Sequence, residues 1–215
     1  MIVKCKRPVL IVEGDGDVAA VPRLIRETLH RHQIYDVSAA PRPKKNVELR
    51  RLRRAGELER FVEYALREDG DSVLVVLDCE DFNPLEIGAE FIERVGKLDG
   101  GKKIGVVLLK SEFETLFLYC LSEIAAHFPE YGWRTNQLAV DGDPEAIRNA
   151  KGRISVAMRE RAYKPTRDQE RFITPLNFDK LRRESPSFRR FEETLLWLAG
   201  QRDADEQFYP IPRSR

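Results

Sequence analysis

Two acidic clusters have the residue types and spacing to do chemistry, because each directly follows an apolar run. The first is Glu13 with Asp17, which flank a Gly-Asp-Gly turn. The second is Asp78 with Glu80, which are two positions apart and therefore point the same way from an extended segment. Converging carboxylates repel one another unless a cation lies among them. Since only oxygen ligands are offered, the pattern predicts Mg²⁺ or Mn²⁺.

A third polar cluster follows the apolar run 104–109 and contains Lys110, Glu112 and Glu114. We expect the two glutamates to add metal ligands and Lys110 to neutralise phosphate charge in a transition state. Simpler roles stay open for all three. Acids favour the first turn of a helix in any case, and Lys110 can equally pair with a neighbouring acid.

The apolar runs alternate with amphipathic segments, which predicts an α/β fold with a mostly parallel, Rossmann-like sheet flanked by helices. In such a sheet, ligands gather beyond the carboxyl ends of the strands, where all three clusters lie. We expect one domain at residues 1–128 and a C-terminal extension of helix and loop at 129–215, packed on it. Expected strands are 8–13, 34–39, 72–78 and 104–109. Expected helices begin at Asp17 and at about 57, 85, 113, 147 (a basic segment) and 187.

The order of these motifs resembles a known family. A strand followed by Glu13-Gly14 and Asp17, and a later strand followed by Asp78-x-Glu80, resemble the Toprim domain of topoisomerases, primases and overcoming-lysogenization-defect nucleases. The segment 111–114 (SEFE) resembles a further acidic motif of the nuclease branch. The resemblance covers about residues 8–128. Glu80 is a departure, because the family has Asp there.

Beyond residue 128, Asp168-Gln169 and the segment 185–188 (SPSF) are similar to uncharacterised bacterial Toprim-like proteins often found beside ATPases. Together the resemblances imply a Mg²⁺-dependent nuclease acting on DNA or RNA, with a separate ATPase partner and a role in anti-phage defence. The expected catalytic residues are Glu13, Asp78 and Glu80, with Lys110 added for its positive charge. The implied metal ligands are Glu13, Asp17, Asp78, Glu80, Glu112 and Glu114.

A basic strip at residues 42–54 is the strongest charge feature of a chain whose net charge is only +1. Its side chains suit the phosphates of a nucleic acid, and a protein docking face or a solvated surface is the equal alternative. It lacks the interleaved aromatics that stack on bases. The expected phosphate contacts are Lys44, Lys45, Arg50, Arg51, Arg53 and Arg54.

Other chemistries are disfavoured by what the sequence lacks. The three cysteines and three histidines form no metal or nucleophile pattern, and no phosphate-binding loop is present. No apolar run is long enough for a membrane span or a signal peptide, so we expect a cytoplasmic protein. The residues 13–17 can also be a plain capping turn or a nucleotide-binding loop, and 78–81 a polar loop. The alternative function is a non-catalytic nucleic-acid-binding or regulatory subunit of an ATPase complex.

Overall fold

A three-stranded parallel sheet in the order β1-β2-β3 forms the centre of the molecule. The computed structural model describes residues 7–36, 43–45, 47–98 and 101–201. The strands are β1 (Pro8–Val12), β2 (Ser72–Asp78) and β3 (Lys103–Leu109), and the register places Leu10, Leu74 and Gly105 side by side. This confirms the α/β class. Of the expected strand at 34–39, residues 34–36 are not a strand, and 37–39 lie outside the described residues.

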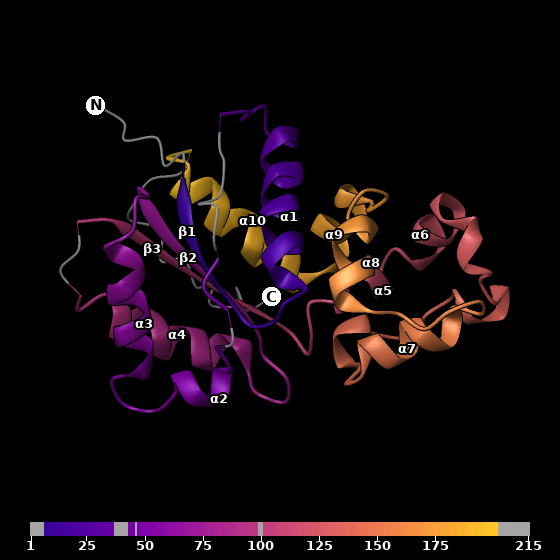
Figure 1. Cartoon of the computed structure of the whole chain (residues 1–215), viewed down its shortest axis with the longest axis horizontal. Helices are drawn as coiled ribbons and strands as arrows, with labels where there is room; N and C mark the ends of the chain where they lie inside the picture. Colours follow the sequence, from indigo (N-terminus) through magenta and orange to yellow (C-terminus); the bar gives the residue numbers. More distant parts are fainter. Residues whose placement is uncertain (1–6, 37–42, 46, 99–100, 202–215) are drawn as a thin grey trace, which may run out of the picture.

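Helices cover both faces of the sheet, which explains why its strands are apolar along almost their whole length (Figure 1). One face is covered by α1 (Asp17–Arg31) and α10 (Pro186–Leu198), and its core includes Leu10 from β1. The other face is covered by α2 (Leu49–Leu52), α3 (Glu57–Leu66) and α4 (Pro84–Val95), and its core includes Ile11. Successive residues of each strand therefore enter two separate cores.

The outer edge of β1 is paired by the backbone of Lys44. Lys44 accepts a hydrogen bond from the Val12 amide and donates one to the Leu10 carbonyl, both at 2.8 Å. Lys44 of the basic strip therefore lies against the sheet, where it covers part of the edge of β1. Its first residue, Arg42, lies outside the described residues.

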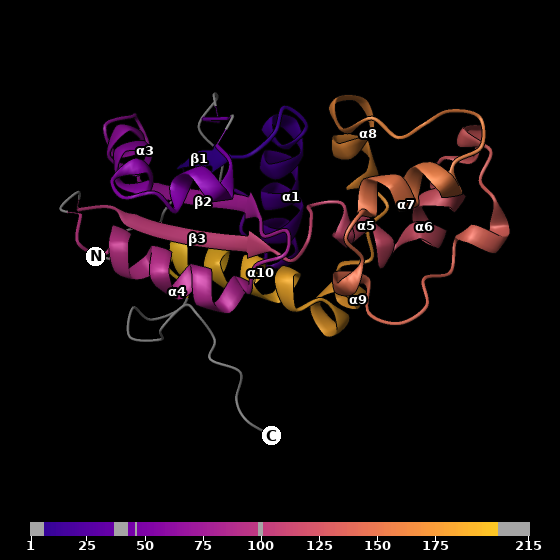
Figure 2. The same ribbon diagram turned by 90° about the horizontal axis from the view of Figure 1, so that it is seen from below.

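A second, helical part of the molecule lies beside the sheet (Figure 2). Its core is aromatic and centres on Phe172. The centroid of the Phe172 ring lies 5.5–5.9 Å from the ring centroids of five neighbours: Phe117, Phe128, Tyr131, Trp133 and Tyr163. Its elements are α5 (Thr115–Leu118), α6 (Leu121–His127), α7 (Ala150–Ala157), α8 (Pro165–Phe172) and α9 (Phe178–Glu184), with 3-10 turns at Pro129–Tyr131, Thr135–Gln137 and Pro144–Ala146.

The chain enters the helical part after β3 and returns to the sheet as α10. The expected boundary at residue 128 therefore falls inside the helical part, and α10, from the expected extension, belongs to the layers of the sheet. Glu145 connects the segment after β3 to the start of α10. Its carboxylate accepts hydrogen bonds from Ser185 Oγ (2.9 Å) and Ser187 N (2.8 Å), and its carbonyl accepts one from Ser111 Oγ (3.2 Å). No helix in the described part of the chain is long and apolar enough to cross a membrane.

The close packing of α10 on β3 gives a first prediction. A Cβ added at Gly105 would lie 2.6 Å from Thr194 Cγ2, so Gly105→Ala forces a shift in a packed interface. We expect a loss of about 1–3 kcal/mol in the free energy of unfolding, measured by urea denaturation. Adding Thr194→Ser removes the clashing methyl group and keeps the hydroxyl, so the double variant should recover most of the loss. A single variant as stable as wild type would contradict this packing.

Candidate active site

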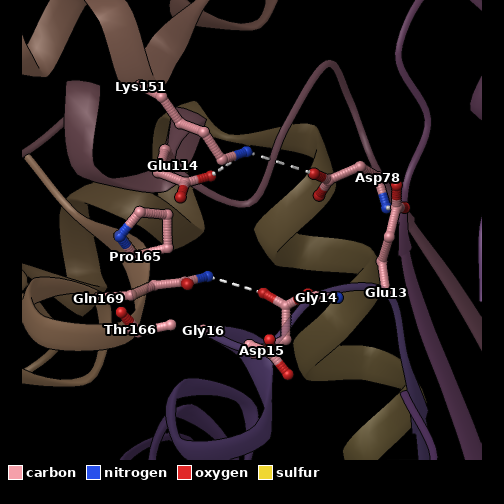
Figure 3. Close-up of a pocket in the computed structure, with 11 residues that line it drawn as sticks. Glu13, Gly14, Asp15, Gly16, Asp78, Glu114, Lys151, Pro165, Thr166 and Gln169 are labelled. Carbon is pink, nitrogen blue, oxygen red and sulfur yellow. Dashed lines mark hydrogen bonds and ion pairs between the residues drawn. The ribbon is translucent and has the colours of Figure 1, made fainter. Parts of the chain in front are cut away.

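A cavity of about 310 Å³ lies where the sheet meets the helical part. It is bounded by the carboxyl ends of β1 and β2, the start of α1, and residues of α7 and α8 (Figure 3). Five of its lining residues are acidic and one is a lysine. The charged lining residues are Glu13, Asp15, Asp17, Asp78, Glu114 and Lys151.

The turn after β1 places Asp17 in the cavity and fixes both of its carboxylate oxygens. Asp17 Oδ2 accepts a hydrogen bond from the Gly14 amide (2.8 Å), and Oδ1 accepts one from Gln169 Nε2 of α8 (2.7 Å). A Cβ at Gly16 would lie 1.9 Å from Gln169 Oε1 and 2.7 Å from Pro165 Cβ. Glycine at position 16 therefore lets α8 approach the turn closely enough for Gln169 to reach Asp17.

Asp78, at the end of β2, is held between the two neighbouring strand ends. Its Oδ1 accepts a hydrogen bond from the Phe113 amide at 2.7 Å. Its own amide donates one to Glu13 Oε2 at 3.2 Å. The side chains of Glu13 and Asp78 are thereby tied to one edge of the sheet, as strands ending in acids predict.

Lys151 of α7 brings a positive charge into this acidic cavity. Its Nζ lies 2.9 Å from Glu114 Oε2, 3.5 Å from Glu112 Oε1 and 3.7 Å from Asp78 Oδ2. Glu114 is 1% exposed and also accepts a hydrogen bond from Tyr163 OH at 3.1 Å. The ammonium group thus joins the carboxylate at the end of β2 to those that follow β3.

The protonation equilibria of the cavity follow from its burial. Burial raises the pKa of Glu13 from 4.5 to about 7. The hydrogen bond from the Asp78 amide lowers this pKa, and the negative charge of Asp17 raises it by a smaller amount. Burial also raises the pKa values of Asp17, Asp78 and Glu114. Burial alone lowers the pKa of Lys151, but the charges of Glu114 and Asp78 outweigh it and raise that pKa, so the ammonium stays charged.

The structure brings four of the predicted acidic residues to the cavity: Glu13, Asp17, Asp78 and Glu114. Glu112 contacts Lys151 without lining the cavity. Glu80 has a φ of +44°, so the chain is not extended there and the common direction expected with Asp78 is not kept. Glu80 instead forms an ion pair with Arg50 at 3.4 Å.

Lys110 also lies outside the cavity lining, because its Nζ donates a hydrogen bond to the Phe82 carbonyl at 2.9 Å. Most of the basic strip is paired with acids: Lys44 with Glu68, Lys45 with Asp15, Arg50 with Glu80, Arg51 with Glu57 and Arg53 with Glu90. Arg54 is exposed.

Three polar residues of the site were not expected from the sequence: Lys151, Tyr163 and Gln169. They lie in the helical part, 73 to 91 positions after Asp78, and no local spacing connects them to the strand-end acids. Gln169 stands in the Asp168-Gln169 pair that carries the wider resemblance, which is the one signal that marks it.

The donor chemistry of the cavity fits a hard divalent cation, because its lining is rich in carboxylates and has no sulfur or imidazole ligand. Five acidic residues against one lysine leave an excess of negative charge. Within the described residues, however, no three carboxylate, histidine or cysteine side chains are grouped closely enough to hold a metal ion as they stand. Binding an ion would require the carboxylates to rotate away from their present partners.

The contacts of Lys151 give a second prediction. Lys151→Met leaves the buried Glu114 with Tyr163 as its remaining side-chain partner. We therefore expect the free energy of unfolding, measured with a metal chelator present, to fall by about 1–3 kcal/mol. The loss is smaller than for a fully buried pair because Lys151 is 38% exposed. Lys151→Met with Glu114→Gln removes the unpaired charge and should recover much of the loss. Equal stability of the double and single variants would show that Glu114 does not depend on Lys151.

The raised pKa of Glu13 gives a third prediction. An acid whose pKa rises on folding binds its proton more tightly in the folded state, so it stabilises the fold below its unfolded pKa of 4.5 and loses that contribution as the pH rises through about 7. Without metal, the melting temperature of the wild type should therefore fall more steeply from pH 5 to 8 than that of Glu13→Gln.

The matched control for this measurement is Glu93→Gln, because the side chain of Glu93 is 74% exposed. Its melting profile should run parallel to that of the wild type. If the profile of Glu13→Gln is also parallel, Glu13 does not titrate in this range.

A family comparison covers both parts of the molecule. The chain matches the model of a family described as a domain of unknown function (DUF4276) over residues 12–196, from the end of β1 into α10. The match includes every charged residue that lines the cavity. No curated protein and no solved structure matches the chain. The chain therefore belongs to the DUF4276 family.

Proposed function

We propose that the protein is a metal-dependent nuclease of the Toprim type, which hydrolyses phosphodiester bonds in the cavity between the sheet and the helical part. The observation that carries the proposal is the convergence of Glu13 and Asp78, from the ends of neighbouring strands, with Asp17 and Glu114. Glu13, Asp17 and Asp78 are motif residues of the Toprim resemblance, and the tight turn between Glu13 and Asp17 matches its first motif.

The lining of the cavity favours hydrolysis by water over a covalent intermediate. Thr166 is the single hydroxyl side chain among the lining residues, and neither cysteine nor histidine is present there. Cys79 and Cys120 are buried, and burial raises the pKa of each thiol to about 11, which keeps it protonated at neutral pH.

Glu13 and Asp78 would hold the ion, with Asp17 and Glu114 completing the set after Lys151 moves. When bound there, Mg²⁺ or Mn²⁺ supplies an activated water and offsets negative charge on the phosphate. The chain itself contributes orientation. Gln169 fixes the rotation of Asp17, the Phe113 amide fixes Asp78, and Tyr163 fixes Glu114.

Lys151, and not Lys110, would supply the positive charge beside the phosphate. It is the one basic side chain among the residues that line the cavity. A phosphate entering the cavity would meet four or more carboxylates, so a lysine beside them reduces the repulsion between enzyme and substrate. The same side chain can release Glu114 and Asp78 and contact a phosphate oxygen.

A second candidate function is a non-catalytic nucleic-acid-binding or regulatory subunit. The position of Lys151 favours it specifically, because an ammonium group among carboxylates can replace a metal ion as their permanent counter-charge. In either case, the resemblance supports a separate ATPase partner, and with it a role in anti-phage defence. ATP-dependent stimulation of activity by an ATPase encoded beside the protein would test that partnership.

A cleavage assay separates the two functions. We expect the purified protein to cleave labelled DNA or RNA with Mg²⁺ or Mn²⁺, and Asp78→Asn to lower the rate on the order of a hundredfold or more, because a metal ligand is lost. The asparagine keeps an acceptor for the Phe113 amide, so the melting temperature should change little.

Asp81→Asn is the matched control, since Asp81 is three positions away, 55% exposed and paired with Arg148 outside the cavity. It should cleave at the wild-type rate. An Asp78→Asn protein with full activity would refute the proposed site. A wild type inactive with every substrate, metal and partner would favour the non-catalytic function.

A further inference from the structure

The segment 148–167 is the second strongly basic stretch of the chain. It contains seven basic residues and one acid, Glu160, a net charge of +6. The strip at 42–54 has the same content, seven basic residues and one acid. The two segments therefore have the same net charge, and the structure distinguishes them by the groups that surround their charges.

The charges of 148–167 are less neutralised than those of the strip. In the part of the chain that the structure describes, no carboxylate lies within 4.0 Å of the charged nitrogens of Arg153, Arg161 or Lys164. Arg159 is 72% exposed and reaches its one acidic neighbour, Glu160, only at 3.9 Å. By contrast, five residues of the strip have ion-pair partners elsewhere in the fold.

Residues near both ends of the basic segment line the cavity. Lys151 lines the cavity from α7, and Pro165 and Thr166 line it from α8. Arg161 is four residues from Pro165, which places it within about 14 Å along the chain. Because one strand of a duplex carries a phosphate about every 3.4 Å along the axis, this distance corresponds to about four phosphates.

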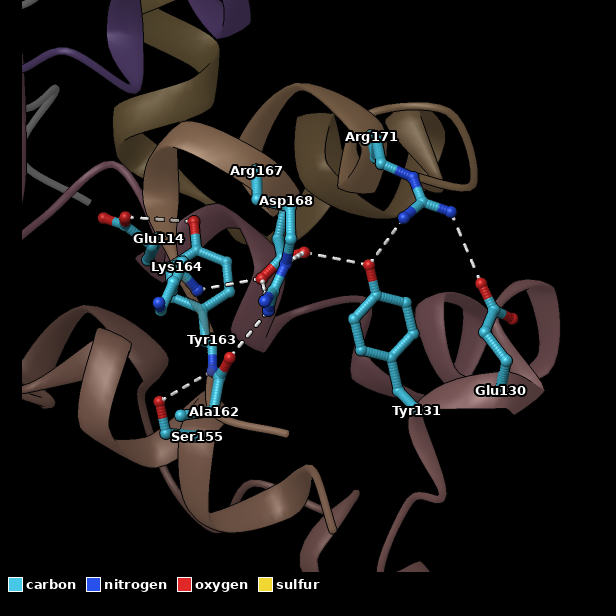
Figure 4. A network of polar contacts seen from close by, with 10 residues as sticks. All are labelled: Glu114, Glu130, Tyr131, Ser155, Ala162, Tyr163, Lys164, Arg167, Asp168 and Arg171. Atoms are coloured by element: carbon cyan, nitrogen blue, oxygen red, sulfur yellow. Dashed lines mark hydrogen bonds and ion pairs between the residues drawn. The ribbon is translucent and has the colours of Figure 1, made fainter. Parts of the chain in front are cut away.

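The backbone of the segment is held in place around the exposed side chains of Arg159, Arg161 and Lys164. Tyr163 reaches inward to Glu114, and its amide donates to Ser155 Oγ at 3.3 Å (Figure 4). The Lys164 amide donates to the buried Asp168 at 2.8 Å, and Asp168 in turn accepts from Tyr131 OH at 2.9 Å. A pre-organised surface of this kind binds a polyanion with little loss of backbone entropy.

We infer that Arg159, Arg161 and Lys164 form the phosphate-binding surface that leads a nucleic acid strand into the cavity. The inference rests on the proposed function for the choice of nucleic acid as the polyanion. Tyr163, the one aromatic residue of the segment, is only 6% exposed, and the ring of Tyr131 beneath Arg161 is buried. Binding is therefore through the backbone phosphates, tolerant of sequence and strongly dependent on salt.

The test compares two variants that lose the same charge. In the cleavage-deficient Asp78→Asn background, one carries Arg159→Gln, Arg161→Gln and Lys164→Gln, and the other carries Arg50→Gln, Arg51→Gln and Arg53→Gln. Binding to labelled single-stranded and duplex 20-mers is measured by fluorescence anisotropy across a salt series. Melting temperatures establish that each variant is folded.

We expect the 159/161/164 variant to bind at least about tenfold more weakly at 0.1 M salt, and its log–log salt slope to fall by about two to three, near 0.9 per lost phosphate contact. The 50/51/53 variant should stay within about twofold of its parent. A general charge effect would weaken both equally and would overturn the inference, as would selective loss in the 50/51/53 variant. If the triple variant does not fold, Lys164→Gln alone should lower the slope by about one.

The failure of this surface and the failure of the proposed function give different results. If the wild type cleaves nucleic acid and the 159/161/164 variant binds as well as its parent, the nuclease function is supported and the phosphate-binding surface is refuted. If that variant alone loses binding and the wild type does not cleave, the phosphate-binding surface is supported and the nuclease function is refuted. Anionic phosphatidylserine vesicles serve as the competing polyanion: a parent that binds vesicles but neither oligonucleotide overturns the inference.

Discussion

Like-charge repulsion at the end of the sheet is the constraint on which the rest of the structure depends. Two parallel strands end in acids, and a turn adds Asp17 beside them, so the fold concentrates negative charge where water is partly excluded. Burial makes each charge costly and raises the pKa of Glu13 to about 7. A cation beside these groups offsets their charge, and in this structure Lys151 is that cation. Its ammonium lies 2.9 Å from Glu114 and 3.7 Å from Asp78.

This cation comes from α7 of the helical part, which lies beside the layers of the sheet. The helical part is inserted between β3 and α10, and its aromatic rings around Phe172 continue the core of the sheet face that α1 and α10 cover. Three of its side chains determine the site: Lys151 balances charge, Gln169 orients Asp17 and Tyr163 orients Glu114. The site is therefore complete only when both parts are folded against one another. Glu145 helps to secure this arrangement, because it joins the start of α10 to the segment after β3.

The sheet and its acidic edge were predictable because they depend on local patterns. A continuous apolar run that ends in an acid, such as 72–78, indicates both a strand buried on two faces and the direction of its last side chain. The positions of Glu80 and Lys110 depend instead on the backbone after the strand, where Glu80 adopts a positive φ and Lys110 reaches the Phe82 carbonyl. The role of Lys151 depends on a contact across 73 positions, which neither spacing nor composition encodes.

The two basic segments show that a count of charges in the sequence does not identify the residues that can bind a phosphate. Each has seven basic residues and one acid, yet Arg51 of the strip lies 2.7 Å from Glu57 while Arg161 of the later segment lies over the ring of Tyr131 at 4.0 Å. An arginine already paired with a carboxylate must give up that partner to bind a phosphate, so the net gain is small. An arginine above an aromatic ring keeps its donors available and its guanidinium group oriented. The capacity to bind a polyanion therefore depends on the acids near each basic residue in the fold, more than on the number of basic residues in a segment.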